Sequence, residues 1–298
     1  MTQKGKQSAA VHGWIALDKP YGMTSTQAVG KIKYVFNAAK AGHAGTLDPL
    51  ASGILPIALG EATKTVPFVQ EGAKAYRFTV RWGEETSTDD AEGPVTARSD
   101  MRPSQAQIEA LLPQFTGTIL QRPPAFSAIK VDGERAYDLA RAGEDVVLAA
   151  REITIHALRL VACAPDEATL EADCGKGTYV RAIARDMGRA LGCYGHVVAL
   201  RRTRVGPFIE AASITLEAFL AGDPHHALMP VEAGLAEIPQ LTIDRNAAAR
   251  LRQGQSIILR GRDAPIEGAA WAACEGVPVA QGVIKRGEFV PKRVLLLG

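Results

Sequence analysis

Residues 42–53 read GHAGTLDPLASG, a loop of small residues that carries an imidazole at His43 and a carboxylate at Asp48. Its glycines let the backbone approach a ligand closely, and Pro49 fixes φ directly after the aspartate. A carboxylate on such a stiff turn is suited to act as a nucleophile or as a base. The ordinary alternative is an aspartate that caps a turn before proline, with a surface histidine beside it. The phosphate-binding pattern of nucleotide hydrolases is missing, so that class loses its main support.

The segments that flank this loop predict a strand, a helix and a second strand. Residues 14–17 (WIAL) and 54–59 are short apolar runs of strand length. Between them, a helix should begin at Ser25, because apolar side chains recur at helical spacing as far as Phe36.

Residues 74–82 (KAYRFTVRW) alternate strictly and predict a half-buried strand. The side chains expected on its apolar face are Tyr76, Phe78, Val80 and Trp82, and the basic ones on polar positions or on the other face are Lys74, Arg77 and Arg81. An acidic loop follows at 86–94, and Ser104 with Gln107 forms a capping box that opens a short helix.

The order of the remaining elements is not a strict alternation of strand and helix. They are a helix at 134–141, strands at 153–162 and 168–174, a helix at 178–191 and a strand at 196–208. This order predicts an α+β protein with a mixed, mostly antiparallel sheet. After about residue 235, short strands alternate with Gly and Pro turns around a helix at 247–252, which predicts a small β-barrel-like domain.

Composition limits the class of protein. The chain has 298 residues, of which 47% are hydrophobic, enough to bury a sizeable core. Its four cysteines form no C-x-x-C pair and no zinc spacing, so a structural metal or a disulfide framework is not expected and the chain is predicted to be cytosolic. No apolar run reaches membrane-spanning length, and the polar start lacks the apolar stretch of a signal peptide.

The net charge is only +2, but basic residues gather in two segments. One is the first forty residues, and the other is residues 174–206, in which Arg181, Arg185 and Arg189 are spaced at i, i+4 and i+8 along the expected helix. Two basic segments in a nearly neutral protein can form a phosphate-binding face. Solvated surface is the ordinary alternative.

Six segments of the sequence resemble segments of one protein family, in the same order along the chain. They are WIALDKPYGMTS (14–25), the loop at 42–53, KAYRFTVRWGEETSTDDAEG (74–93), QRPPAFSAIKVDGERAYDLAR (121–141), CGKGTYVRAIARDMG (174–188) and ALRRTRVGPF (199–208). Together they resemble the TruB-type pseudouridine synthases, over residues 12 to 230. The last sixty residues resemble the PUA-type RNA-binding domain appended in that family. The resemblance implies a flexible basic tail at 1–11, a catalytic pseudouridine synthase domain at 12–235 and a PUA-like domain at 236–298.

The resemblance also implies an activity. Such enzymes isomerise uridine 55 in the T-loop of tRNA to pseudouridine, which breaks the C1′–N1 bond and forms a C1′–C5 bond. Because this reaction has no redox change, no cofactor is expected. The target base must be extruded from the folded loop before it can react. The implied partner is tRNA, held at the T-arm and through the last domain at the acceptor stem, and the protein is expected to be a monomer without a membrane partner.

Three residues match the family's catalytic positions. Asp48 matches the essential aspartate, Arg181 the arginine that pairs with it, and Tyr76 the tyrosine that stacks on the target base and accepts the C5 proton. Sequence alone leaves ordinary alternatives open, namely a surface helix arginine and a core tyrosine.

Further residues match substrate-binding positions. His43 matches the residue that fills the stack vacated by the base, and an imidazole is small enough to insert there. The residues that match the uracil pocket are Lys176, Tyr179 and Leu200. Lys64 matches a position near the active loop, and Asp90, in the acidic loop, is given a supporting role.

Three rival readings remain at this point. The first is a non-catalytic RNA-binding or RNA-folding protein on the same fold, which would not need Asp48. The second is a related pseudouridine synthase that acts on ribosomal RNA within a multiprotein particle. The third is a glycosidase, which normally needs two catalytic carboxylates where the loop offers one.

Overall fold

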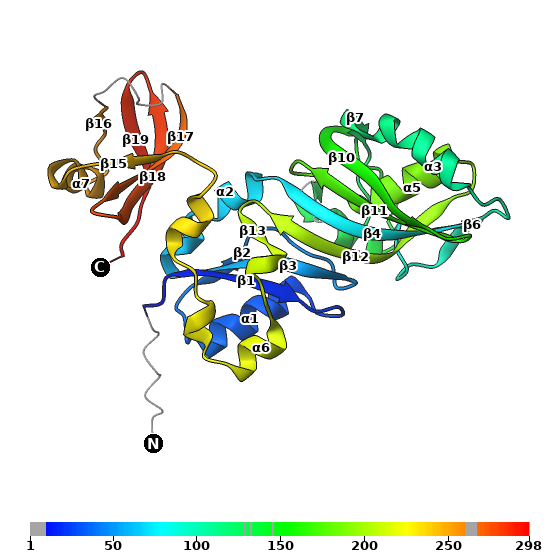
Figure 1. Ribbon diagram of the computed structural model, residues 1–298, viewed down its shortest axis with the longest axis horizontal. Coiled ribbons are helices and arrows are strands. Elements are labelled where there is room, and N and C mark those ends of the chain that lie inside the picture. The colour runs from blue at the N-terminus through cyan, green and yellow to red at the C-terminus, as the bar shows by residue number, and fades with distance from the viewer. Residues whose placement is uncertain (1–9, 128, 132, 145, 260–266, 298) are drawn as a thin grey trace. The chain divides into compact units, whose positions relative to one another are not determined.

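The computed structural model describes residues 10–127, 129–131, 133–144, 146–259 and 267–297 (Figure 1). The basic tail expected at residues 1–11 lies outside these ranges as far as residue 9. Among the described residues, no helix is long and apolar enough to cross a membrane.

Internal contacts divide the chain into two compact units. Unit 1 combines Met1–Pro49, Gly53–Gly72 and Val205–Gly298, and unit 2 combines Leu50–Ser52 and Ala73–Arg204. Unit 1 therefore draws on both ends of the sequence. The domain boundary between residues 235 and 236 stays a prediction.

The first part of unit 1 is built on strand β1 (Gly13–Lys19). It pairs in antiparallel fashion with β3 (Ala51–Leu59) and in parallel with the short β14 (Ile214–Thr215), and β2 (Ala41–His43) pairs with β3. The expected strands at 14–17 and 54–59 are thus confirmed.

The helices and remaining short elements of this part of unit 1 connect or cover these strands. They are α1 (Ser25–Val35), η1 (Gly60–Lys64), α2 (Val66–Glu71), β13 (Phe208–Ile209), η3 (Glu210–Ala212), α6 (Leu216–Ala221), η4 (Pro224–Ala227) and η5 (Val231–Leu235). Helix α1 begins at Ser25 as expected, because Thr24 and Gln27 form a reciprocal capping box. The predicted loop at 42–53 is shorter than expected, since β2 ends at His43 and β3 begins at Ala51.

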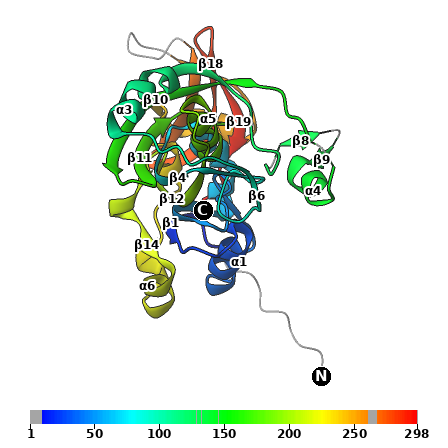
Figure 2. The same cartoon turned by 90° about the vertical axis from the view of Figure 1, so that its right-hand side faces the viewer.

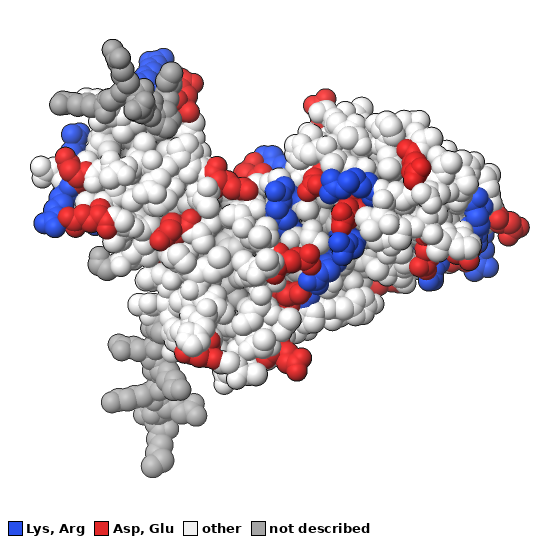
Figure 3. All heavy atoms as spheres, in the orientation of Figure 1, with Lys and Arg blue, Asp and Glu red and all other residues white. Residues whose placement is uncertain are grey.

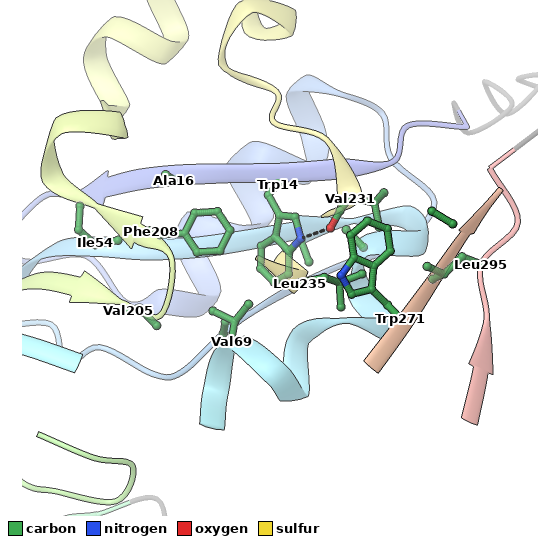
Figure 4. Packing of buried hydrophobic residues seen from close by; sticks show 14 residues of the cluster. Trp14, Ala16, Ile54, Val69, Val205, Phe208, Val231, Leu235, Trp271 and Leu295 are labelled. Carbon is green, nitrogen blue, oxygen red and sulfur yellow. Dashed lines mark hydrogen bonds between the residues drawn. The ribbon is translucent and has the colours of Figure 1, made fainter. Parts of the chain in front are cut away.

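Trp14 lies at the centre of the unit 1 core (Figure 4). Its ring centroid lies 5.1 Å from that of Phe208, and its Nε1 donates to the carbonyl oxygen of Val231 at 3.3 Å. Gly234 packs directly on the indole, where an added Cβ would lie 2.5 Å from Nε1. The same cluster includes Trp271, so one core joins the first strand to a strand near the end of the chain.

The second part of unit 1 is a five-stranded sheet with its own apolar cluster. Its elements are β15 (Gln240–Thr242), α7 (Arg245–Arg252), β16 (Ile257–Ile258), β17 (Gly268–Cys274), β18 (Val277–Lys285) and β19 (Glu288–Val294), with the strand order β15-β17-β18-β19-β16. Two-residue turns with positive φ, Glu275-Gly276 and Arg286-Gly287, connect β17 to β18 and β18 to β19. Such turns match the twist of antiparallel strands. The expected C-terminal β domain is confirmed.

Unit 2 is a mostly antiparallel sheet with the strand order β12-β4-β11-β10-β7. Its elements are β4 (Lys74–Trp82), β5 (Glu84–Thr86), β6 (Val95–Arg98), α3 (Gln105–Leu111), η2 (Leu112–Phe115), β7 (Gly117–Gln121), β8 (Lys130–Val131), β9 (Glu134–Arg135), α4 (Ala136–Arg141), β10 (Arg151–Cys163), β11 (Glu167–Cys174), α5 (Val180–Ala190) and β12 (Gly195–Val205). Figure 2 shows that the β8–β9 hairpin and α4 stand apart from this sheet.

Most expected elements of unit 2 are present, with three differences. The helix expected at 134–141 begins only at Ala136, because the two residues before it form β9. The strand expected at 196–208 ends at Val205, since Gly206 takes a positive φ of 51°. Lys74, expected on a polar position, is buried at the start of β4. The α+β class with a mostly antiparallel sheet is confirmed.

Candidate active site

The loop that carries Asp48 is fastened by backbone and side-chain hydrogen bonds on both sides of the aspartate. On one side, the Ser25 hydroxyl donates to the carbonyl oxygen of Leu47 at 3.0 Å and accepts from its N–H at 2.9 Å. On the other side, the N–H of Gly22 donates to the carbonyl oxygen of Pro49 at 2.7 Å. Asp48 is half-buried between these two attachments. Its backbone is therefore held in place from both neighbours.

The segment that fastens this loop is itself held by Lys19. This side chain is fully buried, and its ammonium donates to the carbonyl oxygens of Pro20 at 3.0 Å and of Met23 at 2.7 Å. A buried ammonium needs such acceptors, because an unpaired charge would be costly to desolvate. The turn at 20–23 and the loop of Asp48 thus form one hydrogen-bonded assembly.

His43 and Lys64 lie on elements next to this loop. His43 is half-buried at the end of β2, where it pairs with Ile57 of β3. Lys64 ends η1 and donates to Glu61 at 2.7 Å and to the carbonyl oxygen of Val294 at 2.8 Å. Two of its three ammonium donors are therefore used within unit 1.

Glu61 extends the contacts of Lys64. The same oxygen that pairs with Lys64 accepts the N–H of Leu296 at 2.7 Å. Burial favours the neutral carboxyl, but the hydrogen bonds from Lys64 and Leu296 and the charge of Lys64 outweigh it and lower the pKa of Glu61 below its ordinary value. Lys64 therefore has a structural role in addition to the substrate-binding role predicted for it.

Arg181, in the first turn of α5, is buried in unit 2 and is not the surface arginine of the ordinary alternative. Its Nη1 donates to the carbonyl oxygen of Thr88 at 2.9 Å and to Asp90 at 3.2 Å, and its Nη2 donates to the carbonyl oxygen of Phe126 at 2.9 Å. The guanidinium is thereby oriented by two separate loops. Asp90, for which a supporting role is predicted, therefore contacts Arg181 directly.

Asp90 is oriented in turn by its own loop. Its side chain accepts hydrogen bonds from the hydroxyl of Thr88 and from the N–H of Glu92, the latter at 3.0 Å. Its carbonyl oxygen accepts from the hydroxyl of Thr86 at 2.6 Å. A carboxylate with this many donors is fixed in one orientation, so it presents a fixed acceptor to Arg181.

One turn further along α5, Arg185 repeats the arrangement. It is buried, and it donates to Asp89 at 2.9 Å, to Asp186 at 2.8 Å and to the carbonyl oxygen of Arg122 at 2.7 Å. Burial raises the pKa of Asp89 to about 6, even though the charges of Arg185 and Arg181 lower it. Another turn on, the exposed Arg189 binds Glu85 through two nitrogens, both at 2.7 Å. Arg181 and Arg185 therefore attach α5 to the acidic loop, and Arg189 attaches it to β5.

Tyr76 is half-buried on β4, in register with Ala172 of β11. Phe78, Val80 and Trp82 follow it on the same strand and are each at most 1% exposed. The predicted apolar face is therefore confirmed, and Tyr76 is its least buried member.

Tyr179, just before α5, is held by Gln121. The Gln121 amide accepts from the N–H of Tyr179 at 2.9 Å and donates to its carbonyl oxygen at 3.1 Å. The Arg151 guanidinium lies 5.3 Å from the centre of the Tyr179 ring, a cation–π contact. Lys176 is exposed nearby in sequence, and Leu200 is buried on β12.

The structure brings together only some of the predicted site residues. Arg181 and Asp90 are in contact within unit 2, which also contains Tyr76 and Tyr179. Asp48 belongs to unit 1, so its pairing with Arg181 stays a prediction.

Sequence reasoning missed four of the supporting residues. Arg185 and Asp89 had a visible signal, namely the i+4 spacing from Arg181 and the run of acids. Ser25 and Gln121 act through hydrogen bonds to backbone far away in sequence, and their local sequence carries no sign of this.

The basic segment at 174–206 differs from expectation. Arg181, Arg185 and Arg202 are at most 7% exposed, and Arg189 is paired with Glu85, so four of the seven basic side chains of this segment are buried or paired. Arg77 and Arg81 are exposed on β4 but each pairs with a glutamate of β11. On the face in Figure 3, basic and acidic side chains are interspersed. The structure thus does not support this segment as a continuous phosphate-binding face.

Comparison with known proteins assigns the chain to a family. Residues 33–180 match the TruB family pseudouridylate synthase N-terminal domain, and residues 181–236 match the tRNA pseudouridylate synthase B C-terminal domain. Every predicted site residue lies within these ranges.

Two curated relatives match almost the whole chain. A tRNA pseudouridine synthase B from Bradyrhizobium diazoefficiens is 58% identical and covers 99% of this chain and 90% of its own. One from Chelativorans sp. is 55% identical and covers 99% of each. Among solved structures, the crystal structure of a Cbf5-Nop10-Gar1 complex matches with a TM-score of 0.72 and 26% identity over 95% of this chain and 84% of the other. This chain belongs to the TruB family of pseudouridylate synthases.

Proposed function

We propose that this protein isomerises uridine 55 in the T-loop of tRNA to pseudouridine, as a monomer in the cytoplasm and without a cofactor. Curated relatives that are 51–58% identical are named tRNA pseudouridine synthase B, which supports tRNA as the substrate. The observation that carries the proposal is the fixed position of Asp48, whose two neighbours in sequence are both fastened by hydrogen bonds. Holding a reacting group in this way lowers the entropy cost of reaching the transition state.

The reaction needs an anionic group against the sugar or the uracil ring. Asp48 supplies the carboxylate, and Arg181 is the cation proposed to pair with it. After the C1′–N1 bond breaks and the C1′–C5 bond forms, C5 must lose its proton while N1 gains one. Tyr76 is the proposed acceptor of the C5 proton, and the net change is zero in both electrons and atoms.

The other site residues hold the RNA in the proposed complex. His43 fills the place left in the T-loop by the extruded base. Lys176, Tyr179 and Leu200 line the uracil pocket, Lys64 supports the RNA near the Asp48 loop, and Asp90 orients Arg181. Residues 236–298 are the proposed PUA-like domain, which binds RNA away from the target base.

A related pseudouridine synthase that works within a multiprotein particle is the weaker alternative. The solved Cbf5-containing complex shares 26% identity with this chain, about half the identity of the relatives named for tRNA. A purely RNA-binding or RNA-folding protein would not require Asp48 to be fastened on both sides.

The test is release of tritium from a T-arm stem-loop RNA labelled at C5 of its uridines, without added metal or cofactor. The wild-type protein should release tritium, and Asp48→Asn should release none while it binds the same RNA with similar affinity. Release by Asp48→Asn at the wild-type rate would refute the role of the aspartate. Tight binding without release by the wild type would favour the RNA-binding alternative.

A further inference from the structure

Tyr21 is a large aromatic side chain that is left exposed on a rigid turn. It is 72% exposed, so its ring contributes little to the apolar core. It stands with Gly22 at the tip of the turn that follows β1, and Gly22 takes a φ of 80°, which favours glycine. The position of the ring is therefore set by a well-defined turn.

This turn is fastened directly to the loop of Asp48. Gly22 donates its N–H to the carbonyl oxygen of Pro49 at 2.7 Å, and Lys19 closes the turn from inside through Pro20 and Met23. Adding the bond lengths along this connection places the Cα atoms of Tyr21 and Asp48 at most about 13 Å apart. Consecutive nucleotides of a single strand are separated by a smaller distance than this, so a nucleotide next to the reacting one lies within reach of the ring.

We propose that Tyr21 is a stacking residue for a nucleotide of the substrate RNA that neighbours the target uridine. This inference rests on the proposed function. Extruding the target base leaves its neighbours partly unstacked, and an exposed aromatic ring replaces the lost stacking for any base, because every base has a π-face. A ring fixed in advance also loses little freedom when the RNA binds.

Tyr34 provides a matched comparison within the same unit. It is 86% exposed, close to the end of α1. Tyr34 is the ninth residue after Ser25, which corresponds to about 14 Å along the helix axis. It shares the chemistry and the exposure of Tyr21 but not the attachment to the Asp48 loop.

The experiment measures binding of a T-arm stem-loop RNA by Tyr21→Ala, Tyr21→Phe and Tyr34→Ala, each in the Asp48→Asn background so that no turnover occurs. Tyr21→Ala should bind roughly 5- to 150-fold more weakly, the range expected for one lost base–aromatic stack. Tyr21→Phe and Tyr34→Ala should bind like the parent. The slope of affinity against salt concentration should not change in Tyr21→Ala, since stacking releases no counterions.

A second readout locates the contact. With 2-aminopurine placed at the nucleotide on either side of the target, one position should fluoresce more brightly with Tyr21→Ala than with the parent, because stacking quenches the probe. Equal affinity of Tyr21→Ala and the parent would overturn the proposal, as would an equal loss in Tyr34→Ala or a loss in Tyr21→Phe. Tritium release by the otherwise wild-type protein tests the proposed function separately, so the two failures are distinguishable.

Discussion

The hydroxyl of Ser25 spans both backbone groups of Leu47, as donor to its carbonyl oxygen at 3.0 Å and as acceptor from its N–H at 2.9 Å. Ser25 is 3% exposed and stands in the first turn of α1, so the helix and the residue before Asp48 are joined by two buried hydrogen bonds. The position of the proposed catalytic carboxylate is therefore coupled to the start of a helix.

Replacement of Ser25 by alanine should lower the turnover number by about tenfold or more, because a small displacement of a catalytic group is costly. The free energy of unfolding should fall by about 1–3 kcal/mol, since both backbone groups of Leu47 lose a buried partner. Steady-state kinetics with the T-arm RNA and chemical denaturation measure the two effects.

Ser104→Ala is the control for this prediction. Ser104 caps α3 in unit 2 through a capping box with Gln107, so its loss should cost about 1 kcal/mol of stability with an unchanged turnover number. If both alanine variants lowered turnover equally, the effect would reflect stability and not the placement of Asp48.

Arg181→Lys should reduce turnover by about a hundredfold while RNA binding changes little. Lysine cannot reproduce donors from two nitrogens toward the separate segments of Thr88 and Phe126, so the position of its charge is no longer fixed. Single-turnover kinetics measure the isomerisation step directly.

Arg189→Ala, which breaks an exposed pair with Glu85, is the control. It should leave turnover unchanged and cost at most about 1 kcal/mol of stability. Wild-type turnover in Arg181→Lys would show that only the charge matters.

The Asp89 carboxyl should make stability depend on pH. Its pKa of about 6 is higher than in an unfolded chain, so the folded state binds its proton more tightly. The stabilisation is fully present below about pH 4 and is lost as pH rises through about 6. Relative to the wild type, Asp89→Asn should therefore gain roughly 2–3 kcal/mol in unfolding free energy between pH 4 and pH 7.5.

Denaturant titrations of both proteins at the two pH values measure this difference, in which the titration of all other groups cancels. A gain by the wild type, and not by Asp89→Asn, as pH rises would mean that the ion pair with Arg185 outweighs the burial of Asp89.

His43→Ala should impair turnover on a structured T-loop more than on a short unstructured RNA that contains the same uridine. Only the folded loop leaves a gap in a base stack when the target is extruded, so only there would an inserted imidazole be needed. The ratio of kcat/KM for the two RNAs, compared between the variant and the wild type, gives the result. An unchanged ratio would remove the stack-filling role.

Helices and strands were predicted correctly where their sequence pattern lies within a few neighbouring residues. The Ser104–Gln107 capping box, the alternation of β4 and the helix that begins at Ser25 all depend on residues within a few positions of one another. Burial of charged residues did not follow from the sequence. Lys19 is buried against carbonyl oxygens of the turn that follows it. Arg185 is buried because distant loops supply carbonyl and carboxylate acceptors, and helical periodicity does not record which loops close over an element.

The candidate site shows the same limit. Asp48, Tyr76 and Arg181 were found by resemblance, whereas the residues that hold their surroundings required coordinates. Gln121 fixes Tyr179 across 58 positions of sequence, and Arg181 reaches Thr88 across 93. Such long-range pairs are set by the topology of the sheet.

The Trp14 cluster also bears on the order in which the chain folds. Trp14 leaves the ribosome early, but its partners Phe208, Val231 and Trp271 are synthesised some two hundred residues later. Most of unit 2 is one continuous stretch, Ala73–Arg204, whose sheet can assemble as soon as that stretch has emerged. During translation, β1 can pair with β3 early, but the core around Trp14 stays incomplete, with apolar surface exposed, until the last part of the chain arrives.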